Sequence, residues 1–352
     1  MASIRSIARS AGVSVATVSR TLNNLPDVSE KTRSLVLAAA DEAGYDVASK
    51  RRKSALIGLA YPGAPVHAEF GGFDSAIVSG VTRGVSEHKF DVVLLNVARD
   101  KRRGETFAQF FRRKNVAGVV LRSFAESRRL CEQIAEEGIP HVVVADRFDN
   151  PAVNFIRNDS YQQTGAAMEH LASLGHRRVG LCIHMVADSD HDDRRRAYRE
   201  GLTQFGMDCD PRLEFEEIAN MDGGAKAINS LMSLPQPPTA LLVTDPLASL
   251  GVLRRCLELS IDVPRELSIV GFDDSGVRHM AYPVYTSVCQ DAAALGRDAA
   301  HWLTRRVSGR ESGGLRCVNQ TFFEVNQTTA PPPATPVRVM PNGQRVSTAA
   351  AL

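Results

Sequence analysis

The sequence lacks the cysteine spacings that mark a metal site or a redox pair. Its six cysteines, at positions 131, 182, 209, 256, 289 and 317, form no CxxC pattern. Most of them lie within apolar or helical stretches. This indicates free, mostly buried thiols in a reducing compartment rather than a disulfide framework.

Long apolar runs are also missing. No stretch of about 18 apolar residues occurs, which excludes a membrane-spanning helix and a membrane partner. The N-terminal stretch "MASIRSIARS" has no apolar core of the kind that a signal peptide needs. We therefore expect a cytoplasmic protein.

Catalytic patterns are absent as well. The sequence contains no Walker A motif, no GxSxG elbow and no HExxH pair. Asp273 and Asp274 resemble a catalytic carboxylate pair, but the side chains of adjacent residues rarely point at the same bond of a substrate. We expect neither an enzyme nor a cofactor.

The net charge of +2 conceals an uneven distribution. Residues 1–53 contain nine Lys and Arg but five Asp and Glu, a net charge of +4, so the remaining residues carry −2. A small basic segment before a slightly acidic body suggests a head that binds a polyanion.

Residues 3–44 predict three short helices, each of which begins at a serine able to cap it: Ser3, Ser14 and Ser29. Gly12 suits the tight turn between the first two helices. In the third helix, the residues expected to face the core are Leu35, Val36, Ala39 and Ala40.

The stretch "IARSAGVSVATVSRTLNN", residues 7–24, has the layout of a helix-turn-helix, in which the second helix enters the DNA major groove. Val15 and Ala16 would project into the groove at the start of that helix. Arg20 could reach a guanine edge or a phosphate, and the hydroxyls of Ser14, Thr17 and Ser19 could bond phosphates. An ordinary pair of small helices is the alternative that spacing alone leaves open.

From residue 56 onward, short apolar strands alternate with amphipathic helices. The predicted strands are 56–61, 91–96, 116–121, 140–145, 179–184, 239–244 and 267–272, and helices between them include 76–88, 127–137 and 161–174. Strands that are apolar on both faces favour parallel sheets in an α/β protein, here as two doubly wound lobes. The segment from about residue 328 is rich in Pro, Ala and Ser and is predicted to be disordered.

The segments "GVSVATVSRTLN" and "VSEKTRSLVLAAADEAGY" resemble the N-terminal domain of the lactose-repressor (LacI/GalR) family of bacterial transcription regulators. The resemblance continues through "PHVVVADR", "RAYREGL" and "ELSIVGFDDSG" and covers about residues 3–327. It implies a three-helix DNA-binding domain at 1–46, a hinge at 47–55 and a two-lobed body, like periplasmic sugar-binding proteins, at 56–327. Lobe 1 would comprise about 56–157 and 286–314, and lobe 2 about 158–285 and 315–327, with a disordered tail at 328–352. The chain would cross between the lobes near Arg157, Tyr285 and Leu315.

The resemblance also implies the partners: a pseudo-palindromic DNA operator, a second copy of the chain and a small effector, a sugar. The residues expected to contact DNA are Ser14, Val15, Ala16, Thr17, Ser19, Arg20, Asn23, Thr32, Lys50, Arg51 and Arg52. Those expected to contact the effector between the lobes are Phe73, Asp74, Asp146, Arg194, Thr244, Asp245 and Asp273. Carboxylates and a guanidinium suit a polyhydroxylated ligand, and Asp245 could equally be the cap of the next helix.

One acidic stretch offers a rival interpretation. "HMVADSDHDD", residues 184–193, places Asp188, Asp190 and Asp192 at the spacing that opens a calcium loop. However, Asp193 and Arg199 occupy the positions at which that loop needs Gly and Glu. We therefore expect a solvated loop at the mouth of the cleft and no metal.

The linker departs from the family pattern. Family members have about 17 residues between the equivalents of Tyr45 and Ile57, including a hinge helix of the type "PNxxARxL", whose Leu wedges into the minor groove. This chain has only 11, from Asp46 to Leu56, and lacks that motif. Its basic run from Lys50 to Lys53 can still neutralise phosphates, or it is only a solvated linker.

We therefore expect a sequence-specific, effector-gated transcriptional repressor of a sugar-utilisation operon. The alternative is a cytoplasmic binding protein for a sugar or nucleoside with weak or vestigial DNA binding. A sugar-processing enzyme is disfavoured because no catalytic constellation is present.

Overall fold

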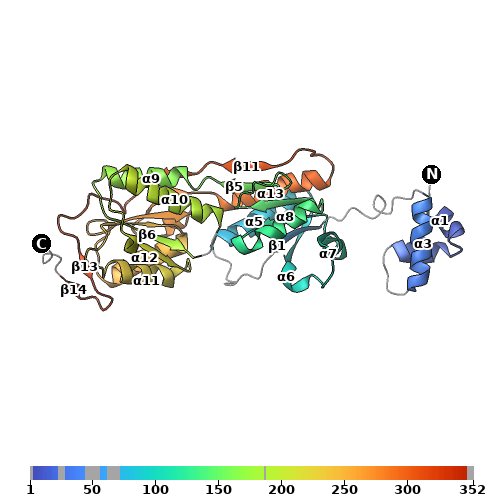
Figure 1. Cartoon of the computed structure of the whole chain (residues 1–352), viewed down its shortest axis with the longest axis horizontal. Coiled ribbons are helices and arrows are strands. Elements are labelled where there is room, and N and C mark those ends of the chain that lie inside the picture. Colours follow the sequence, from blue (N-terminus) through green and yellow to red (C-terminus); the bar gives the residue numbers. More distant parts are fainter. Residues whose placement is uncertain (1–2, 23–27, 44–55, 62–71, 186–187, 347–352) are drawn as a thin grey trace. The chain divides into compact units, whose positions relative to one another are not determined.

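The computed structural model of the 352-residue chain describes residues 3–22, 28–43, 56–61, 72–185 and 188–346 (Figure 1). The chain divides into two compact units, residues 1–55 and 56–352. The first unit contains α1 (Ile4–Ser10), α2 (Val15–Leu22) and α3 (Glu30–Glu42). The predicted hinge at 47–55, with Lys50, Arg51 and Arg52, and the DNA-contact candidate Asn23 lie outside the described residues.

The head forms the three predicted helices, and their serine caps are in place. The hydroxyl of Ser3 accepts from the Ser6 amide, and that of Ser14 accepts from the Thr17 amide at 3.0 Å. Gly12 has a φ of +65°, the left-handed backbone that the turn requires.

The small core of the head is built from Ile7, Ala8, Val18, Leu22, Val36, Ala39 and Ala40. Leu35, predicted to face this core, is instead 52% exposed. The 3.6-residue period explains the error, because Val36, Ala39 and Ala40 already fill the inward stripe of α3.

The first lobe of the body is a parallel sheet covered by helices on both faces. Its strand order is β11-β5-β4-β3-β1-β2, and every neighbouring pair is parallel. The strands are β1 (Leu56–Tyr61), β2 (Asp91–Asn96), β3 (Gly118–Arg122), β4 (His141–Val144), β5 (Phe155–Asn158) and β11 (Arg316–Asn319). The helices are α5 (Gly72–Glu87), α6 (Val97–Asp100), α7 (Phe107–Arg113), α8 (Arg128–Glu136) and α13 (Ala292–Val307).

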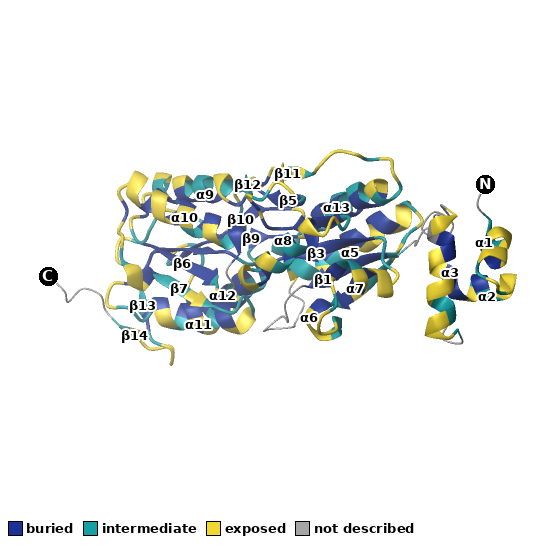
Figure 2. Ribbon diagram, turned by 45° about the vertical axis from the view of Figure 1, so that its right-hand side comes forward, coloured by how far each residue is buried: buried dark blue, intermediate teal, exposed yellow. Residues whose placement is uncertain are grey.

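The second lobe repeats this architecture, with the strand order β12-β10-β9-β8-β6-β7. Its strands are β6 (Val179–His184), β7 (Glu214–Glu217), β8 (Ala240–Val243), β9 (Ser268–Asp273), β10 (Thr286–Cys289) and β12 (Phe322–Glu324), and only β12 pairs antiparallel. The helices are α9 (Gln162–Ser173), α10 (Ser189–Gln204), α11 (Met221–Leu231) and α12 (Pro246–Glu258). Buried strands between helices with exposed outer faces are visible in both lobes (Figure 2), so the predicted α/β class is confirmed.

Helices α5 and α13 approach each other closely in the first lobe. A Cβ atom placed on Gly80 would lie 1.9 Å from the carbonyl oxygen of Ala293, and one on Gly296 would lie 2.5 Å from that of Ile77. Only glycine leaves room for this contact between two backbones.

The chain passes between the lobes three times, and the three crossings are bonded to one another. They follow Asn158, separate β10 from α13, and separate β11 from β12. The Asn158 side-chain amide donates to Gln290 Oε1 at 3.2 Å, and the Thr321 hydroxyl donates to the Asp159 carbonyl at 2.7 Å. The crossings therefore form one bonded cluster.

Two of the predicted boundaries are wrong. The predicted bounds place β10 in lobe 1, but it belongs to the second sheet, and they place β11 in lobe 2, but it belongs to the first sheet. Each misplaced strand is four residues long, too short for its pattern alone to show which sheet it joins.

The prediction of disorder from residue 328 is also wrong for residues 328–346. Thr328 is buried and bonds the backbone of Ile269, while the hairpin of β13 (Arg338–Val339) and β14 (Arg345–Val346) buries Val339 in the second lobe. Arg345 forms an ion pair with Glu266 at 2.6 Å. The composition suggested disorder, but these few side chains find long-range partners.

Candidate functional site

The head exposes the start of α2, which the sequence assigns to base reading. Val15 is 47% exposed, and Ala16 and Arg20 are exposed beside it. Val18 and Leu22 fix the opposite face of α2 in the core. The first turn of α2 therefore presents apolar groups to its surroundings while the helix itself is held rigidly.

The remaining candidates in the head have local partners. The Ser14 hydroxyl lies 2.8 Å from the Thr17 hydroxyl, and that of Thr32 lies 2.8 Å from Ser29. Ser19 and Thr32 are half-buried. Both hydroxyl pairs lie in the first turns of α2 and α3, where helix amides can bind phosphate.

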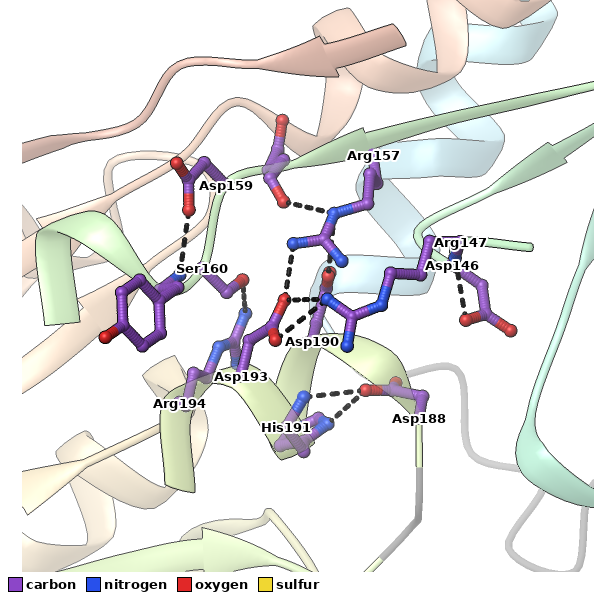
Figure 3. A network of polar contacts seen from close by, with 12 residues as sticks. Asp146, Arg147, Arg157, Asp159, Ser160, Asp188, Asp190, His191, Asp193 and Arg194 are labelled. Carbon is purple, nitrogen blue, oxygen red and sulfur yellow. Dashed lines mark hydrogen bonds and ion pairs between the residues drawn. The ribbon is translucent and has the colours of Figure 1, made fainter. Parts of the chain in front are cut away.

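The body places a dense ionic cluster where its two lobes meet (Figure 3). Asp193 of α10 in the second lobe accepts from Arg157 Nη2 at 2.6 Å and from Arg147 Nη1 at 2.8 and 2.9 Å. Both arginines belong to the first lobe. Asp193 is 1% exposed and Arg157 is buried, so their ion pair is shielded from water, whereas the Arg147 side chain is about half exposed. Both pairs link the two lobes.

A second set of contacts lies beside the first. The Arg122 guanidinium, at the end of β3, lies 3.5 Å from Asp188 of the second lobe and donates to Asp74 at 3.0 Å. The Asp188 side chain caps α10 by accepting from the His191 amide, and it lies 2.8 Å from His191 Nδ1. Arg122 thus connects the predicted effector residue Asp74 to the opposite lobe.

Asp190 is the least satisfied carboxyl of this region. Its nearest cation is Arg157, whose Nε lies 3.9 Å from Oδ1. Burial, together with the neighbouring Asp188, raises the pKa of Asp190, while His191 and Arg122 hold the pKa of Asp188 low. Asp188 therefore keeps its negative charge, whereas burial favours the protonated form of Asp190.

The expectation of a solvated loop at 184–193 is wrong for its helical part, because Asp188, Asp190 and Asp193 are all buried. Counting charges suggested exposure, but the balancing arginines come from distant positions in the sequence. Among the described residues, no group of three or more His, Cys, Asp or Glu side chains is arranged to hold a metal ion.

The predicted effector residues of the second lobe gather near this cluster. Arg194 lies on α10, donates to the Thr244 carbonyl at 2.8 Å and stacks on Phe272 with its guanidinium 4.2 Å from the ring centroid. Asp245 caps α12 by accepting from the amides of Leu247 and Ala248, as its alternative role required. Burial raises the pKa of Asp245 to about 6, although Arg194 acts in the opposite direction.

Asp273 is already bonded in this structure. Its Oδ1 accepts from the Val277 amide at 2.8 Å, and its Oδ2 accepts from Arg278, which also binds Glu324. The neighbouring Asp274 is the carboxyl whose charge interacts with Asp245 and Arg194. Burial and Asp245 raise the pKa of Asp274 to about 7, and Gln290 donates to it at 2.6 Å. Sequence reasoning singled out the first Asp of the pair and gave the second no role in binding.

The first-lobe candidates occupy two places. Phe73 packs beside Arg122, 5.4 Å from its guanidinium, in the same group as Asp74. Asp146 lies apart, where its Oδ1 accepts from Arg128 at 2.6 Å and from the Arg147 amide. It reaches the ionic cluster only through Arg147.

Buried polar atoms without a hydrogen-bond partner concentrate in this region. Among the described residues, the buried side-chain atoms without a hydrogen-bond partner on the segments around the ionic cluster are Ser123 Oγ, Asp146 Oδ2, Arg157 Nη1, Ser189 Oγ, Asp190 Oδ1, Arg194 Nε and Thr244 Oγ1. Each such atom costs about 1–3 kcal/mol unless it finds a partner. Donors and acceptors mixed in this way match a ligand that carries several hydroxyl groups.

The sequence missed the arginines that complete the site. Arg122 and Arg147 received no role, and Arg157 was regarded only as support for a crossing. Each lies at or just beyond the carboxyl end of a strand of the first sheet, which is where α/β proteins bind ligands. That position is the signal that could have found them.

Comparison with known proteins agrees with this division of the chain. Residues 3–47 match the family described as bacterial regulatory proteins, lacI family, and residues 168–316 match a periplasmic binding protein-like domain. Together the two matches cover the head and much of the body.

Relatives match the chain over nearly its whole length. The HTH-type transcriptional repressor CytR of Escherichia coli strain K12 is 29% identical over 343 residues, which cover 94% of this chain and 97% of that protein. The HTH-type transcriptional regulator MalR of Streptomyces coelicolor is 28% identical over 341 residues, covering 93% and 96%. A solved complex of the transcriptional regulator CelR with cellobiose is 28% identical, with a TM-score of 0.68, and covers 93% of this chain and all of that one.

No helix among the described residues has both the length and the apolar character needed to cross a bilayer. The head has the helix-turn-helix geometry, the body has two parallel α/β lobes, and both match the same group of regulators. The chain therefore has a lacI-family helix-turn-helix head and a periplasmic-binding-protein-like domain in its body.

Proposed function

We propose that this protein represses a sugar-utilisation operon and that a small polyhydroxylated effector, bound between its lobes, controls its affinity for DNA. The observation that carries the proposal is the set of buried polar atoms without a hydrogen-bond partner on the segments around the ionic cluster, among them Arg157 Nη1, Arg194 Nε and Thr244 Oγ1. The exposed first turn of α2 supplies the DNA-reading surface. CelR, which was solved with cellobiose, supports a sugar as the effector.

The working form in this proposal is a homodimer, because a pseudo-palindromic operator needs two reading heads. Met280 and Tyr282, 82% and 94% exposed, form an apolar surface segment that a second copy could cover. As a transcription regulator, it would act in the bacterial cytoplasm, where the operator lies, and without catalysing a reaction.

The effector would act by shifting the relative positions of the lobes. A ligand that binds one arrangement better than the other changes the population of the two, and the coupling is reciprocal between effector and DNA. The salt bridges of Asp193 belong to the arrangement described above. An effector that favours the other arrangement has to break them.

DNA binding is tested by fluorescence anisotropy with a duplex from the gene's own upstream region and a random duplex of equal length. We expect the upstream duplex to bind at least a hundredfold more tightly at moderate salt. In the Arg20→Ala variant, affinity should fall by about 1–3 kcal/mol, chiefly at one base position. Equal affinity of the native protein for both duplexes would refute the proposal.

Effector binding is tested by a thermal-shift screen of mono- and disaccharides, with nucleosides as controls. Stabilisation follows RT ln(1 + [L]/Kd), so a ligand of about micromolar affinity is readily detected at millimolar concentration. Arg194→Gln should abolish the shift. The matched control Arg195→Gln should retain it, because Arg195 pairs with Glu214 and Glu216 of β7.

The rival function is a binding protein whose DNA binding is vestigial, and one added measurement separates the two. The sugar that gives the thermal shift is titrated into the complex with the upstream duplex. Repressor function requires a change in DNA affinity, whereas the rival function predicts none.

A further inference from the structure

The end of the first lobe at which the linker arrives carries many cations. Strand β1 begins at Leu56, and the Leu56 carbonyl accepts from the Ala117 amide at 2.9 Å. Just before Ala117, the end of α7 is folded back by bonds from the Asn115 amide to the Arg112 carbonyl and from the Val116 amide to the Phe111 carbonyl. The cationic end of α7 therefore lies beside the point where the body begins.

Helix α13 ends at the same place. A Cβ atom placed on Gly118, the residue after Ala117, would lie 2.9 Å from Val307 Cγ1 at the end of α13. Helix α5 also ends here, since its following strand β2 begins at Asp91, directly opposite Leu56. Three helix ends thus surround the first residue of the body.

We define the linker-proximal face by the cations at these three ends: Lys89, Arg112, Arg113, Lys114, Arg305, Arg306 and Arg310. All are exposed except Lys114, which is half-buried. The carboxylates among them are Glu87, Asp91, Asp100, Glu105 and Glu311, and Glu87 and Glu311 already pair with His301 and Arg305. Cations outnumber anions on this face.

The pKa of His88 responds to the positive charges of this face. Partial burial lowers its pKa, and the nearby charges of His301, Arg310 and Arg305 lower it further, against the opposing effect of Glu87. Some of the cations have partners, because Arg113 binds Glu105 and Lys114 binds Asp100. In the part of the chain that the structure describes, the side chains of Lys89, Arg112 and Arg310 form no hydrogen bond or ion pair.

We propose that the linker-proximal face contacts the phosphate backbone of the DNA that the head holds, so that the body itself adds to DNA affinity. This inference rests on the proposed function. Residues 44–55, which join the two units, can span at most roughly 40 Å when fully extended. A tether this short gives the face a millimolar effective concentration near the duplex, so even weak phosphate contacts contribute.

The composition of the linker points the same way. In the sequence, the basic run from Lys50 to Lys53 comes shortly before Leu56, so basic residues occur in the linker as well as on the face. DNA is favoured over an acidic protein as the partner because the short linker keeps bound DNA within reach of this face whenever the head is bound to it.

The test is the salt dependence of DNA affinity for the full-length Arg112→Ala and Arg310→Ala variants. Each phosphate contact contributes about 0.9 to the slope of log K against log salt, so losing one contact from each half of a dimer reduces the slope by about 1.8. When salt rises from 50 to 200 mM, the fold-decrease in affinity of each variant should then be about 12 times smaller than that of the native protein. The reduction should be the same on the upstream and the random duplex.

Arg129→Ala is the matched control. Arg129 is an exposed arginine of the same lobe at the start of α8, which follows the opposite ends of the strands. Urea unfolding verifies that the three variants are folded, and Lys89→Gln supplies a further test if one of them is not. The inference is overturned if the Arg112→Ala and Arg310→Ala variants have the same slope as Arg129→Ala and the native protein. The face would then not contact DNA, and an acidic protein would be the better candidate for its partner. If the native protein does not prefer its upstream duplex, the proposed function fails while the slopes still decide this inference.

Discussion

The Asp193→Asn substitution tests whether the ionic cluster holds the two lobes together. Asp193 accepts from Arg157, Arg147 and Arg196 at 2.6–2.9 Å. The Arg147 and Arg196 side chains are about half exposed, so water replaces much of what they lose. Arg157 is buried, and in the variant its nearest remaining carboxylate is Asp190, whose contact is 3.9 Å.

Removing one partner of a buried ion pair costs about 3–5 kcal/mol. Asp190 can lose its proton and take over part of the pairing, so we expect a loss of about 2–4 kcal/mol in the free energy of unfolding. Urea denaturation of the full-length protein at pH 7 measures this loss. The matched control is Asp192→Asn, which removes an exposed carboxylate from the same helix and should cost less than about 1 kcal/mol.

A double variant with Arg157→Met isolates the pair. If the two groups interact directly, the combined loss should differ from the sum of the single losses by about 0.5–3 kcal/mol. The explanation fails if Asp193→Asn and Asp192→Asn unfold at the same urea concentration. It also fails if the losses of the Arg157 and Asp193 variants simply add.

Three further substitutions have expected outcomes. Asp274 keeps its proton in the folded protein up to about pH 7 but loses it near pH 4 when unfolded, so it makes the native protein less stable as pH rises through this interval. Asp274→Asn should remove this contribution to the loss of unfolding free energy between urea series at pH 5 and pH 8. An unchanged loss would contradict the assignment. Val339→Ala should lower the unfolding free energy by about 1–3 kcal/mol, because Val339 is fully buried in the second lobe; no change in the urea midpoint would mean that the hairpin does not pack. Gly80→Val should separate α5 from α13 and lower the melting temperature by several degrees, whereas Gly72→Val, with nothing within 4 Å, should have little effect.

Local patterns predicted the elements well. Three predicted strands, at 56–61, 91–96 and 179–184, have the bounds of β1, β2 and β6, and the serine caps of the head appear where expected. These features depend on residues a few positions apart, and the sequence shows such residues together.

Long-range partners caused the errors. Asp193 looked solvated because its partners Arg147 and Arg157 lie 46 and 36 positions away. Val339 looked like part of a tail because the core it joins is formed by distant elements, the helices α11 and α12 and the strands β6, β8 and β9. A charged or isolated apolar side chain has no visible partner in the sequence, so its environment depends on a fold that local patterns do not determine.

The three bonded crossings determine how the lobes can move. Because Asn158 is bonded to Gln290, and Thr321 to Asp159, the connections cannot bend independently without breaking those bonds. Sliding and twisting of one lobe against the other would stretch all of them at once. A rotation about a line through the three crossings disturbs these bonds least, so we expect the lobes to move relative to each other mainly by such a hinge rotation. In the proposed mechanism, the effector would therefore act by changing the angle between the two lobes.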